Sequence, residues 1–324
     1  MNEEKITTKY NNWVENVLIA NQPKGNIFIY LPECGLGDKI TCFPAFRYLK
    51  KLNPDKKIIL VTEEFASDIW RLNKYIDFII PQEYLASGPE SIFLRDKLDT
   101  GKICNWSFFE HHQKHVVKSC VEKITGEIPN EKTIDLTYEF NLSAADVALA
   151  EASAAELLKK AGSKKLIAIA PANTMLSRMW PGGYWFKLVE LLQKENYYVV
   201  SLGGNNDLDI KNVDLDKRNK YPIRLIPRIL DVFDYLIEIN SGMLHIGSVN
   251  QDIKMVHLNT GQYPEKIMLP FRANNDIYHN RIVINHSCPE KYDCFFGHIT
   301  EREIDKQSEE YNSQFMLETG EKLM

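Results

Sequence analysis

The sequence predicts an α/β protein built on two sheets of parallel strands. Short apolar segments rich in β-branched residues alternate with amphipathic segments, which is typical of parallel strands covered by helices on both faces. This rhythm runs through residues 26–81 and restarts at residue 166. A chain of 324 residues also exceeds the usual size of a single hydrophobic core, which favours two domains.

The expected elements follow directly from these segments. We expect strands at 26–32, 57–62 and 77–81 in the first block, and at 166–171, 197–204, 235–240, 253–261 and 281–286 in the second. Helices are expected at 40–52 and 66–72, and Pro44 predicts a kink or a restart in the first of them. Residues 82–130 carry little strand signal and are expected to be irregular.

A helix at 143–162 is expected to join the two blocks. Ser143 can cap its start, Asp146 stands three residues on in a capping-box position, and Gly162 can end it. The expected division is a first domain at 1–150, a second domain at 151–300 and a charged helical tail at 301–324.

The composition argues against nucleic-acid-binding, membrane-spanning and secreted proteins. A net charge of −5 gives no electrostatic case for binding nucleic acid. The sequence has neither the roughly 20 apolar residues of a membrane span nor, at residues 1–13, the apolar core of a signal peptide. Its six cysteines are dispersed, as reduced thiols are. We expect a cytoplasmic protein, and a local basic patch would still allow peripheral binding at the inner face of the cytoplasmic membrane.

The first candidate site is the turn after the strand at 26–32. Gly35 and Gly37 allow a tight turn and a close approach of a ligand to the backbone. Asp38 then stands at the carboxyl end of a parallel strand, where open α/β sheets bind ligands. The alternative is that Asp38 only caps the following helix. A dinucleotide-binding motif would need a third glycine where Ile40 stands, so NAD binding is disfavoured.

The second candidate site is the polar loop after the strand at 166–171. Its polar side chains are Asn173, Thr174, Ser177 and Arg178, and Pro181 marks a helix start just beyond them. Hydroxyls and N–H groups near a helix start suit phosphate oxygens, and an arginine adds bidentate, permanently charged contacts. The alternative is an ordinary surface loop with Trp180 and Trp185 packed beneath it.

Two further turns complete the set of candidate sites. Gly203 and Gly204 end a strand and would let a nucleoside lie against the backbone, although such a cluster also fits a plain βα turn. Ser241 and Gly242 follow the strand at 235–240, and His245 falls in the first turn of the next helix. N–H groups, a hydroxyl and an imidazole would then converge on one spot of the size of an anion, while a structural histidine is the alternative.

Two groups of residues resemble metal sites but have unsuitable spacing. The first consists of Glu110, His111, His112 and His115, and the second of His286, Cys288, Cys294 and His298. The first lacks the H-E-x-x-H order and a third ligand, so a solvated polar face is favoured. The second could supply four zinc ligands or one disulfide, but its cysteine spacing is wrong for zinc. We expect no bound metal.

Three segments, in this order, resemble glycosyltransferase family 9, the lipopolysaccharide heptosyltransferases. They are GLGDKITCFPAFRYLKKLNPDKKIILVT (35–62), IAPANT with RMWP (169–181), and NSGMLHIGS (240–248). In the family, the corresponding segments hold a Gly-Asp and a Pro-Ala pair, a phosphate loop before Lys/Arg-x-Trp-Pro, and Asp-(Ser/Thr)-Gly-x-x-His. The ordered set covers most of residues 26–290.

The resemblance implies a GT-B fold, in which two Rossmann-like domains with parallel sheets face each other across a cleft. It also implies that the first domain binds an acceptor and the second a nucleotide-sugar donor. In this family the reaction is inverting and independent of metal, the usual donor is ADP-heptose, and the acceptor is a glycan or glycolipid such as lipopolysaccharide core. No cofactor is expected.

The resemblance also implies roles for individual residues. Asp38 matches the family's proposed catalytic base, beside the acceptor-side turn of Gly35 and Gly37. The expected donor contacts are Asn173, Thr174, Arg178, Gly203, Gly204, Asn206, Asn240, Ser241, Gly242 and His245.

Two departures from the family leave the donor open. Asn240 stands where the family has an aspartate, and Asn205 and Asn206 stand where it has an acidic residue after the glycine turn. A transferase acting on a saccharide is therefore the leading hypothesis. The alternatives are an enzyme of the same fold with another donor or a protein acceptor, an epimerase, and a non-catalytic protein that only binds a nucleotide sugar.

Overall fold

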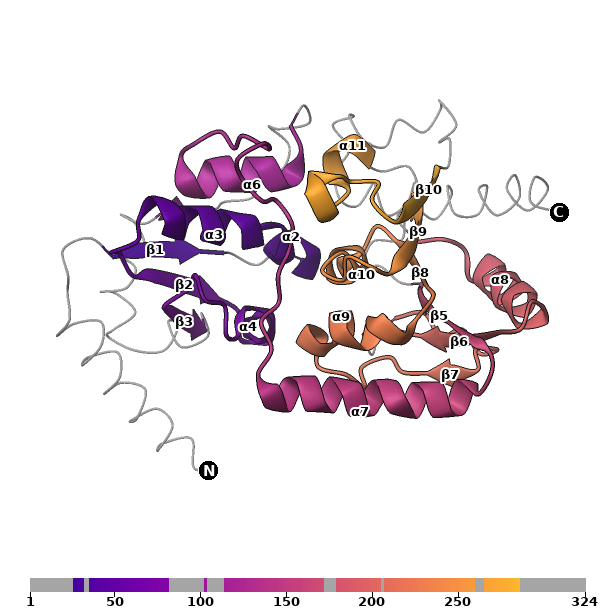
Figure 1. Cartoon of the computed structure of the whole chain (residues 1–324). Coiled ribbons are helices and arrows are strands. Elements are labelled where there is room, and N and C mark those ends of the chain that lie inside the picture. The colour runs from indigo at the N-terminus through magenta and orange to yellow at the C-terminus, as the bar shows by residue number, and fades with distance from the viewer. Residues whose placement is uncertain are drawn as a thin grey trace, which may run out of the picture.

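The chain forms two α/β units that lie side by side in the computed structural model (Figure 1). The structure describes residues 26–31, 35–81, 102–103, 114–171, 179–204, 207–259 and 265–285. One sheet lies in each unit, and every described strand pair within the two sheets is parallel. The predicted α/β class with two parallel sheets is confirmed. No helix in the described ranges is long and apolar enough to cross a membrane.

The first unit holds a sheet of four strands in the order β3-β2-β1-β4. All five residues of β2 are buried, as expected for a strand that is covered on both faces. The strands are β1 (Ile27–Tyr30), β2 (Ile58–Thr62), β3 (Phe78–Pro81) and β4 (Lys102–Ile103), and the helices are α2 (Leu36–Thr41), α3 (Phe43–Leu52), α4 (Glu64–Trp70) and α6 (Val116–Thr125).

Two helices occupy the place of the single helix expected at 40–52. The chain turns at Cys42 between α2 and α3, and Pro44 is the second residue of α3. At that position a proline costs little, because the first N–H groups of a helix have no partner within it. The predicted restart at Pro44 is confirmed.

Helix α6 corrects the expectation that residues 82–130 are irregular. Its buried side chains are Val116, Val117, Cys120, Val121, Ile124 and Thr125. Their spacing places them on one face, which packs against α3 in the same core. Gly126 ends the helix in the left-handed conformation, with φ of 79°.

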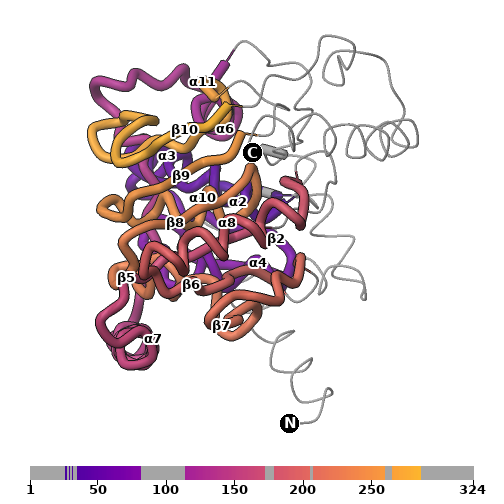
Figure 2. Tube along the Cα trace, turned by 90° about the vertical axis from the view of Figure 1, so that its right-hand side faces the viewer, coloured from indigo at the N-terminus to yellow at the C-terminus, as the bar shows by residue number. Residues whose placement is uncertain are grey.

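The second unit holds a sheet of six strands in the order β10-β9-β8-β5-β6-β7. Figure 2 shows these strands one above another, with α8 across the face turned to the viewer. The strands are β5 (Lys165–Ala170), β6 (Tyr197–Ser201), β7 (Leu215–Asp216), β8 (Tyr235–Ile239), β9 (Lys254–Asn259) and β10 (Arg281–Asn285), and the α-helices are α7 (Ala144–Ala161), α8 (Gly182–Lys194), α9 (Ile226–Ile229), α10 (Gly242–Gly247) and α11 (Glu265–Met268). Short 3-10 turns are η5 (Ile223–Leu225), η6 (Leu230–Val232) and η7 (Ala273–Asn275).

Helix α7 begins and ends as its sequence predicts. The Ser143 hydroxyl accepts a hydrogen bond from the Asp146 N–H at 3.1 Å, and the Asp146 carboxylate accepts one from the Ser143 N–H at 3.2 Å. Gly162 follows its last residue. The helix runs unbroken across residue 150. The division of the chain into domains at 1–150 and 151–300 stays a prediction. The helical tail expected at 301–324 lies outside the described residues.

Among the described residues, three groups of contacts join the two units, and the first two are called the front contact and the back contact. In the front contact, Leu36 and Gly37 of α2 meet Gly242 and His245 of α10. In the back contact, α6 meets the segment 269–275, chiefly through His115 and Phe271. In the third, Arg224 of η5 pairs with Asp68 of α4 and Asp146 of α7. A single cluster of buried apolar side chains runs through both units.

Candidate active site between the two units

Strand order identifies where each sheet can bind a ligand. In the second sheet the chain moves outward from β5 through β6 to β7, then returns to start β8 on the other side of β5. In the first sheet β1 lies between β2 and β4 in the same way. The carboxyl ends of strands at such reversals leave a crevice for ligands. The turns after β1 and β8 begin α2 and α10, which meet in the front contact.

A pocket of about 310 Å³ lies at the front contact, between the two units. The first unit contributes the turn of Gly35 to Asp38, and the second contributes residues after β6, after β7 and after β8. The structure therefore brings together nine of the site residues predicted from the sequence: Gly35, Gly37, Asp38, Gly203, Gly204, Asn240, Ser241, Gly242 and His245.

Asp38 lies inside the first turn of α2, where its carboxylate faces back toward the helix start. The carboxylate accepts a hydrogen bond from the Gly35 N–H at 3.1 Å. Asp38 therefore supports the helix start from the third helical position, while Gly35 is the N-cap residue. The capping role and the pocket position coexist, because a carboxylate has more than one acceptor site.

Gly37 allows the two units to approach each other closely. A Cβ atom at this position would lie 2.6 Å from Cδ2 and 3.0 Å from Nε2 of His245. Any larger residue would have to displace the imidazole. Across the same contact, a Cβ on Gly242 would meet Leu36 at 3.6 Å, which is an ordinary van der Waals distance.

The turn after β8 presents mainly neutral polar groups to the pocket. The Ser241 hydroxyl accepts a hydrogen bond from the Met243 N–H at 3.2 Å and so caps α10. His245 is buried, and its Nδ1 lies 3.3 Å from the hydroxyl of Tyr138. Burial, ahead of the nearby Cys120 thiol, raises the pKa of Tyr138 well above its usual range, so its hydroxyl keeps the hydrogen.

The glycine turn after β6 is closed by a carboxylate. Gly203 has φ of 148°, and its neighbour Gly204 donates its N–H to Asp207 at 2.7 Å. A Cβ on Gly203 would lie 2.1 Å from that same carboxylate, so the turn requires glycine there. Asp207, the residue that follows Asn205 and Asn206, lines the pocket.

One wall of the pocket was missed from the sequence. It consists of Asn219, Tyr221, Ile223, Ile226, Met243, Ile246 and Met268. Asn219 has a positive φ of 51° and donates its N–H to the Gly203 carbonyl at 2.7 Å. The sequence analysis made no prediction for this segment, which folds back onto the glycine turn through that hydrogen bond.

The remaining expected donor contacts cannot be placed. Asn173, Thr174, Ser177 and Arg178 lie outside the described residues, as does Asn206. The flanking structure agrees with the prediction, since Pro181 directly precedes α8. Trp185 of α8 is fully buried, and Trp180 packs edge-on against it with ring centroids 5.2 Å apart.

A buried ion pair supports the first-unit turn and was also missed from the sequence. Nζ of Lys39, the residue after Asp38, lies 2.6 Å from the Glu63 carboxylate. Glu63 precedes α4 and also accepts a hydrogen bond from the Thr62 hydroxyl at 3.2 Å. Both charged side chains are almost completely buried, so each depends on the other for its solvation.

His115 is not a metal ligand and not part of a solvated polar face. Its Nδ1 accepts a hydrogen bond from the Val117 N–H at 3.2 Å, and its Nε2 lies 2.8 Å from the Leu269 carbonyl. Burial lowers its pKa to about 4, which keeps the ring neutral. In the part of the chain that the structure describes, no three His, Cys, Asp or Glu side chains gather to hold a metal. The other residues of both predicted groups lie outside that part.

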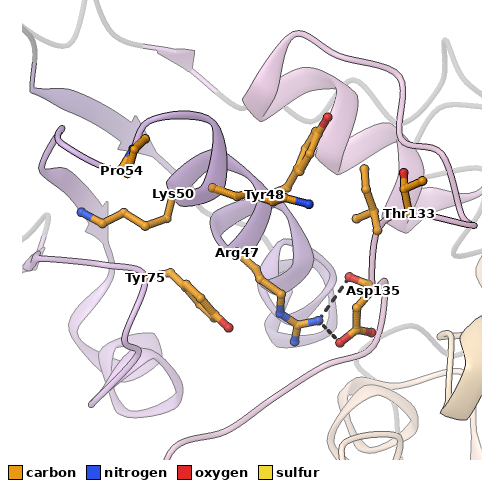
Figure 3. A pocket seen from close by; sticks show the side chains of 9 residues that line it. Arg47, Tyr48, Lys50, Pro54, Tyr75, Thr133 and Asp135 are labelled. Atoms are coloured by element: carbon orange, nitrogen blue, oxygen red, sulfur yellow. Dashed lines mark hydrogen bonds and ion pairs between the residues drawn. The ribbon is translucent and has the colours of Figure 1, made fainter.

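A second pocket, of about 470 Å³, lies along α3 and shares no residue with the first (Figure 3). Its cationic side chains are largely neutralised by carboxylates. Arg47 pairs with Asp135, and Lys50 lies 2.9 Å from the Asp77 carboxylate. This pocket therefore offers an anion little net attraction.

Comparison with known proteins points to one family. A family model described as glycosyltransferase family 9 (heptosyltransferase) matches residues 107–247. No curated protein matches the chain.

Several solved structures share the fold. A family 9 glycosyl transferase from Veillonella parvula is 15% identical, with a TM-score of 0.61 over 90% of this chain and 98% of that one. The ADP-heptose lps heptosyltransferase II of E. coli is 13% identical, with a TM-score of 0.59 over 91% and 100%. The iron-containing dodecameric glycosyltransferase TibC of enterotoxigenic E. coli is 17% identical, with a TM-score of 0.56 over 86% and 73%.

At these identities the solved structures establish the fold, and the predicted GT-B arrangement is confirmed. The family model matches less than half of the chain, and its match ends on the last residue of α10, a helix that lines the pocket between the units. The chain is therefore similar to the heptosyltransferases of glycosyltransferase family 9 over residues 107–247, and it shares the fold of the solved structures over most of its length.

Proposed function

We propose that this chain transfers a sugar from a nucleotide-linked donor to a hydroxyl of a saccharide acceptor, with inversion at the anomeric carbon. The donor proposed first is ADP-heptose, and the acceptor is a glycan or glycolipid such as lipopolysaccharide core. One observation carries the proposal: a single pocket is lined by Asp38 from one unit and by Asn240, Ser241 and His245 from the other.

The proposed chemistry is a single displacement. Asp38 accepts the proton of the acceptor hydroxyl as that oxygen attacks the anomeric carbon, and the bond to the nucleoside diphosphate breaks. The leaving diphosphate gains negative charge. His245 and the polar groups around Ser241 are proposed to stabilise that charge, and Arg178 is proposed to add a permanently charged contact.

The apolar wall of the pocket supports a nucleoside on the second unit. Tyr221, Ile223 and Met268 offer surfaces against which a base can pack, and Asp207 and Asn219 lie beside them with polar groups. The ADP-heptose heptosyltransferase II among the similar structures suggests adenine as the base. Asn240 in place of the family's aspartate still leaves the sugar to be tested.

Nucleoside diphosphates test the donor half of the proposal. Ligand at 100 times its dissociation constant is expected to add about 2.7 kcal/mol to the free energy of unfolding. We expect ADP to stabilise the protein against heat more than UDP or GDP does. Arg178→Ala is expected to reduce that stabilisation, since a charge-assisted contact contributes about 1.5–3 kcal/mol. No response to any of the three nucleotides would contradict a glycosyltransferase function.

Turnover tests the rest of the proposal. A panel of sugar nucleotides is incubated with the protein and cell-envelope extract, and the products are followed by chromatography and mass. We propose that transfer needs no metal and persists in EDTA. Iron and zinc are quantified in the same preparation, because a similar structure is described as iron-containing. Activity that disappears with EDTA and returns with one metal would overturn this part.

A further inference from the structure

Helix α4 lies on the side of the first unit that faces the second unit (Figure 1). It follows β2, and the neighbouring strand β1 leads into the turn that holds Asp38. One buried ion pair joins α4 to that turn, and another ion pair joins α4 to the second unit. The helix therefore connects the proposed catalytic base to the unit that is proposed to bind the donor.

The first ion pair fixes the turn to the start of α4. Nζ of Lys39 lies 2.6 Å from the carboxylate of Glu63, the residue before α4, and both side chains are almost completely buried. Lys39 directly follows Asp38 in α2. A helix of six residues such as α2 is not stable on its own, so contacts with neighbouring elements decide its position. A displacement of α4 would therefore also displace the turn.

The second ion pair fixes α4 to the second unit. The Arg224 guanidinium of η5 bonds through Nη1 to Asp68 of α4, and through Nη2 to Asp146 of α7 at 2.7 Å. Only 11% of the Arg224 side chain is exposed. The residue before it, Ile223, lines the pocket between the units. Arg224 therefore connects a wall of the pocket to α4, and Asp146 keeps it paired within the second unit.

The two ion pairs are better suited to fixing direction than to stabilising the fold. Burying the charges of Lys39 and Glu63 has a desolvation cost that can exceed their attraction, and an apolar pair of similar volume is often at least as stable. The Asp68 side chain is 28% exposed, so its contact with Arg224 contributes little to stability. Each pair nevertheless joins a charged donor to a carboxylate, which restricts the geometry of the contact.

We propose that the Asp68–Arg224 ion pair positions Asp38 relative to the second unit. It acts through α4 and through the buried ion pair at the start of that helix. The proposed reaction requires a fixed position, because the base comes from one unit and the donor from the other, and a misplacement of about 1 Å can cost about 10²-fold in rate. The catalytic role of Asp38 rests on the proposed function, whereas the link from Asp68 to α2 does not.

Asp68→Asn tests this link in the whole protein. Arg224 keeps its bond to Asp146, so the variant is expected to fold and to melt near the parent temperature. Hydrogen exchange of the α2 amides is expected to become about threefold faster, as the loss of a partly exposed ion pair implies. Glu63→Gln, which weakens the other ion pair, is expected to accelerate the same amides at least as much. The amides of β2 are expected to keep their parent rates in both variants.

Glu151→Gln is the matched control. Arg228 pairs with Glu151 and with Asp231, so it repeats the arrangement of one arginine and two carboxylates, but all three residues belong to the second unit. The loss of one carboxylate there is expected to leave both the exchange of α2 and the rate of turnover unchanged.

Turnover provides the second measurement, with the donor and acceptor on which the parent protein is active. Asp68→Asn is expected to lower kcat about tenfold and to leave the Kd for ADP unchanged, since the donor is proposed to bind the second unit. A contact that only stabilised the fold would lower the melting temperature and leave kcat of the folded protein unchanged. Because the two ion pairs act in series, Asp68→Asn/Glu63→Gln is expected to lose no more kcat than the stronger single variant.

The outcomes separate the link from the proposed function. Unchanged exchange of α2 in Asp68→Asn would overturn the link, and so would failure of this variant to fold. Losses of kcat that multiply in the double variant would also overturn it, because the two ion pairs would then act independently. If Asp68→Asn shows the faster exchange but the parent transfers no sugar from any tested donor, the link is supported and the proposed function is contradicted.

Discussion

The two units touch at the front and at the back through a buried histidine in each place, and these histidines are bonded differently. In the back contact, both nitrogens of His115 bond to backbone atoms, one to Val117 and one to Leu269. In the front contact, Nδ1 of His245 lies within hydrogen-bond distance of the Tyr138 hydroxyl, its Nε2 edge packs against Gly37, and the residue lines the pocket. The histidine of the back contact therefore has backbone partners, whereas the histidine of the front contact meets a side chain and borders the pocket.

The side chain of Asn275, like that of His115, bonds only to backbone groups among the described residues. Its side chain accepts a hydrogen bond from the Leu136 N–H at 2.8 Å and donates to the carbonyls of Glu131 and Ile134. One amide thereby fixes the linker to the second unit. All of its partners are backbone groups of described residues, as they are for His115. Burial alone does not distinguish the two histidines, because both are buried, whereas the kind of partner that each one has does.

The largest expected effect concerns the front contact. Asp38→Asn is expected to lower kcat by about 10²–10⁴-fold, because a general base typically contributes that much. The amide oxygen can still accept from the Gly35 N–H, so the helix start and the melting temperature are expected to persist. Steady-state kinetics and thermal unfolding measure the two effects.

The nucleotide response is the control for this variant. Asp38 belongs to the unit opposite the proposed donor turn, so stabilisation by ADP is expected to stay at the parent level. Near-normal turnover by Asp38→Asn would leave Asp38 with the capping role alone.

A smaller effect is expected from the glycine that brings the units together. Gly37→Ala would place a Cβ 2.6 Å from the His245 ring, and overpacking of this kind typically costs about 1–3 kcal/mol. The variant is expected to unfold at lower temperature and to respond less to ADP, since His245 must move. Denaturant unfolding with and without ADP measures both.

Gly242→Ala is the matched control across the same contact. Its Cβ would meet Leu36 at 3.6 Å, so we expect its free energy of unfolding to lie within about 1 kcal/mol of the parent value. Equal losses in the two variants would mean that close approach at Gly37 is not what the front contact requires.

The sequence predicted most of this architecture because the strands are nearly continuous apolar segments. Every strand expected in the two blocks is present, and its ends differ from the expected ones by at most three residues. The misses have physical reasons. Strands β4 and β7 have two residues each, too few for a periodic pattern. Helix α6 was not predicted, although its apolar residues recur at helical spacing, because residues 82–130 were treated as one irregular segment.

The candidate site was predictable where a turn follows a strand. The turns at Gly35–Asp38 and Asn240–His245 were found in this way, because the carboxyl ends of parallel strands are where ligands bind. Tyr138 and Tyr221 were not found, since each reaches the site from a segment without regular structure. Their positions depend on how the two units pack, and no local pattern records that packing.

The smallest expected effect concerns the back contact. It is a change with pH in the contribution of His115 to the free energy of unfolding. Burial lowers the pKa of His115 from its ordinary 6.5 to about 4 in the folded chain. As the pH falls, the unfolded chain therefore takes up this proton first. The contribution of His115 is full above pH 6.5 and is lost as the pH falls through that value toward 4.

Between pH 7 and 5 this linkage amounts to roughly 2 kcal/mol of unfolding free energy. His115→Gln removes the titrating group, so its free energy of unfolding is expected to fall less steeply over this interval than that of the parent. The comparison uses slopes, because the lost bonds to Val117 and Leu269 lower the stability of the variant at every pH. Denaturant unfolding at five pH values measures both slopes. Parallel slopes would mean that His115 is not held neutral, and the back contact would then lose its distinction from the front.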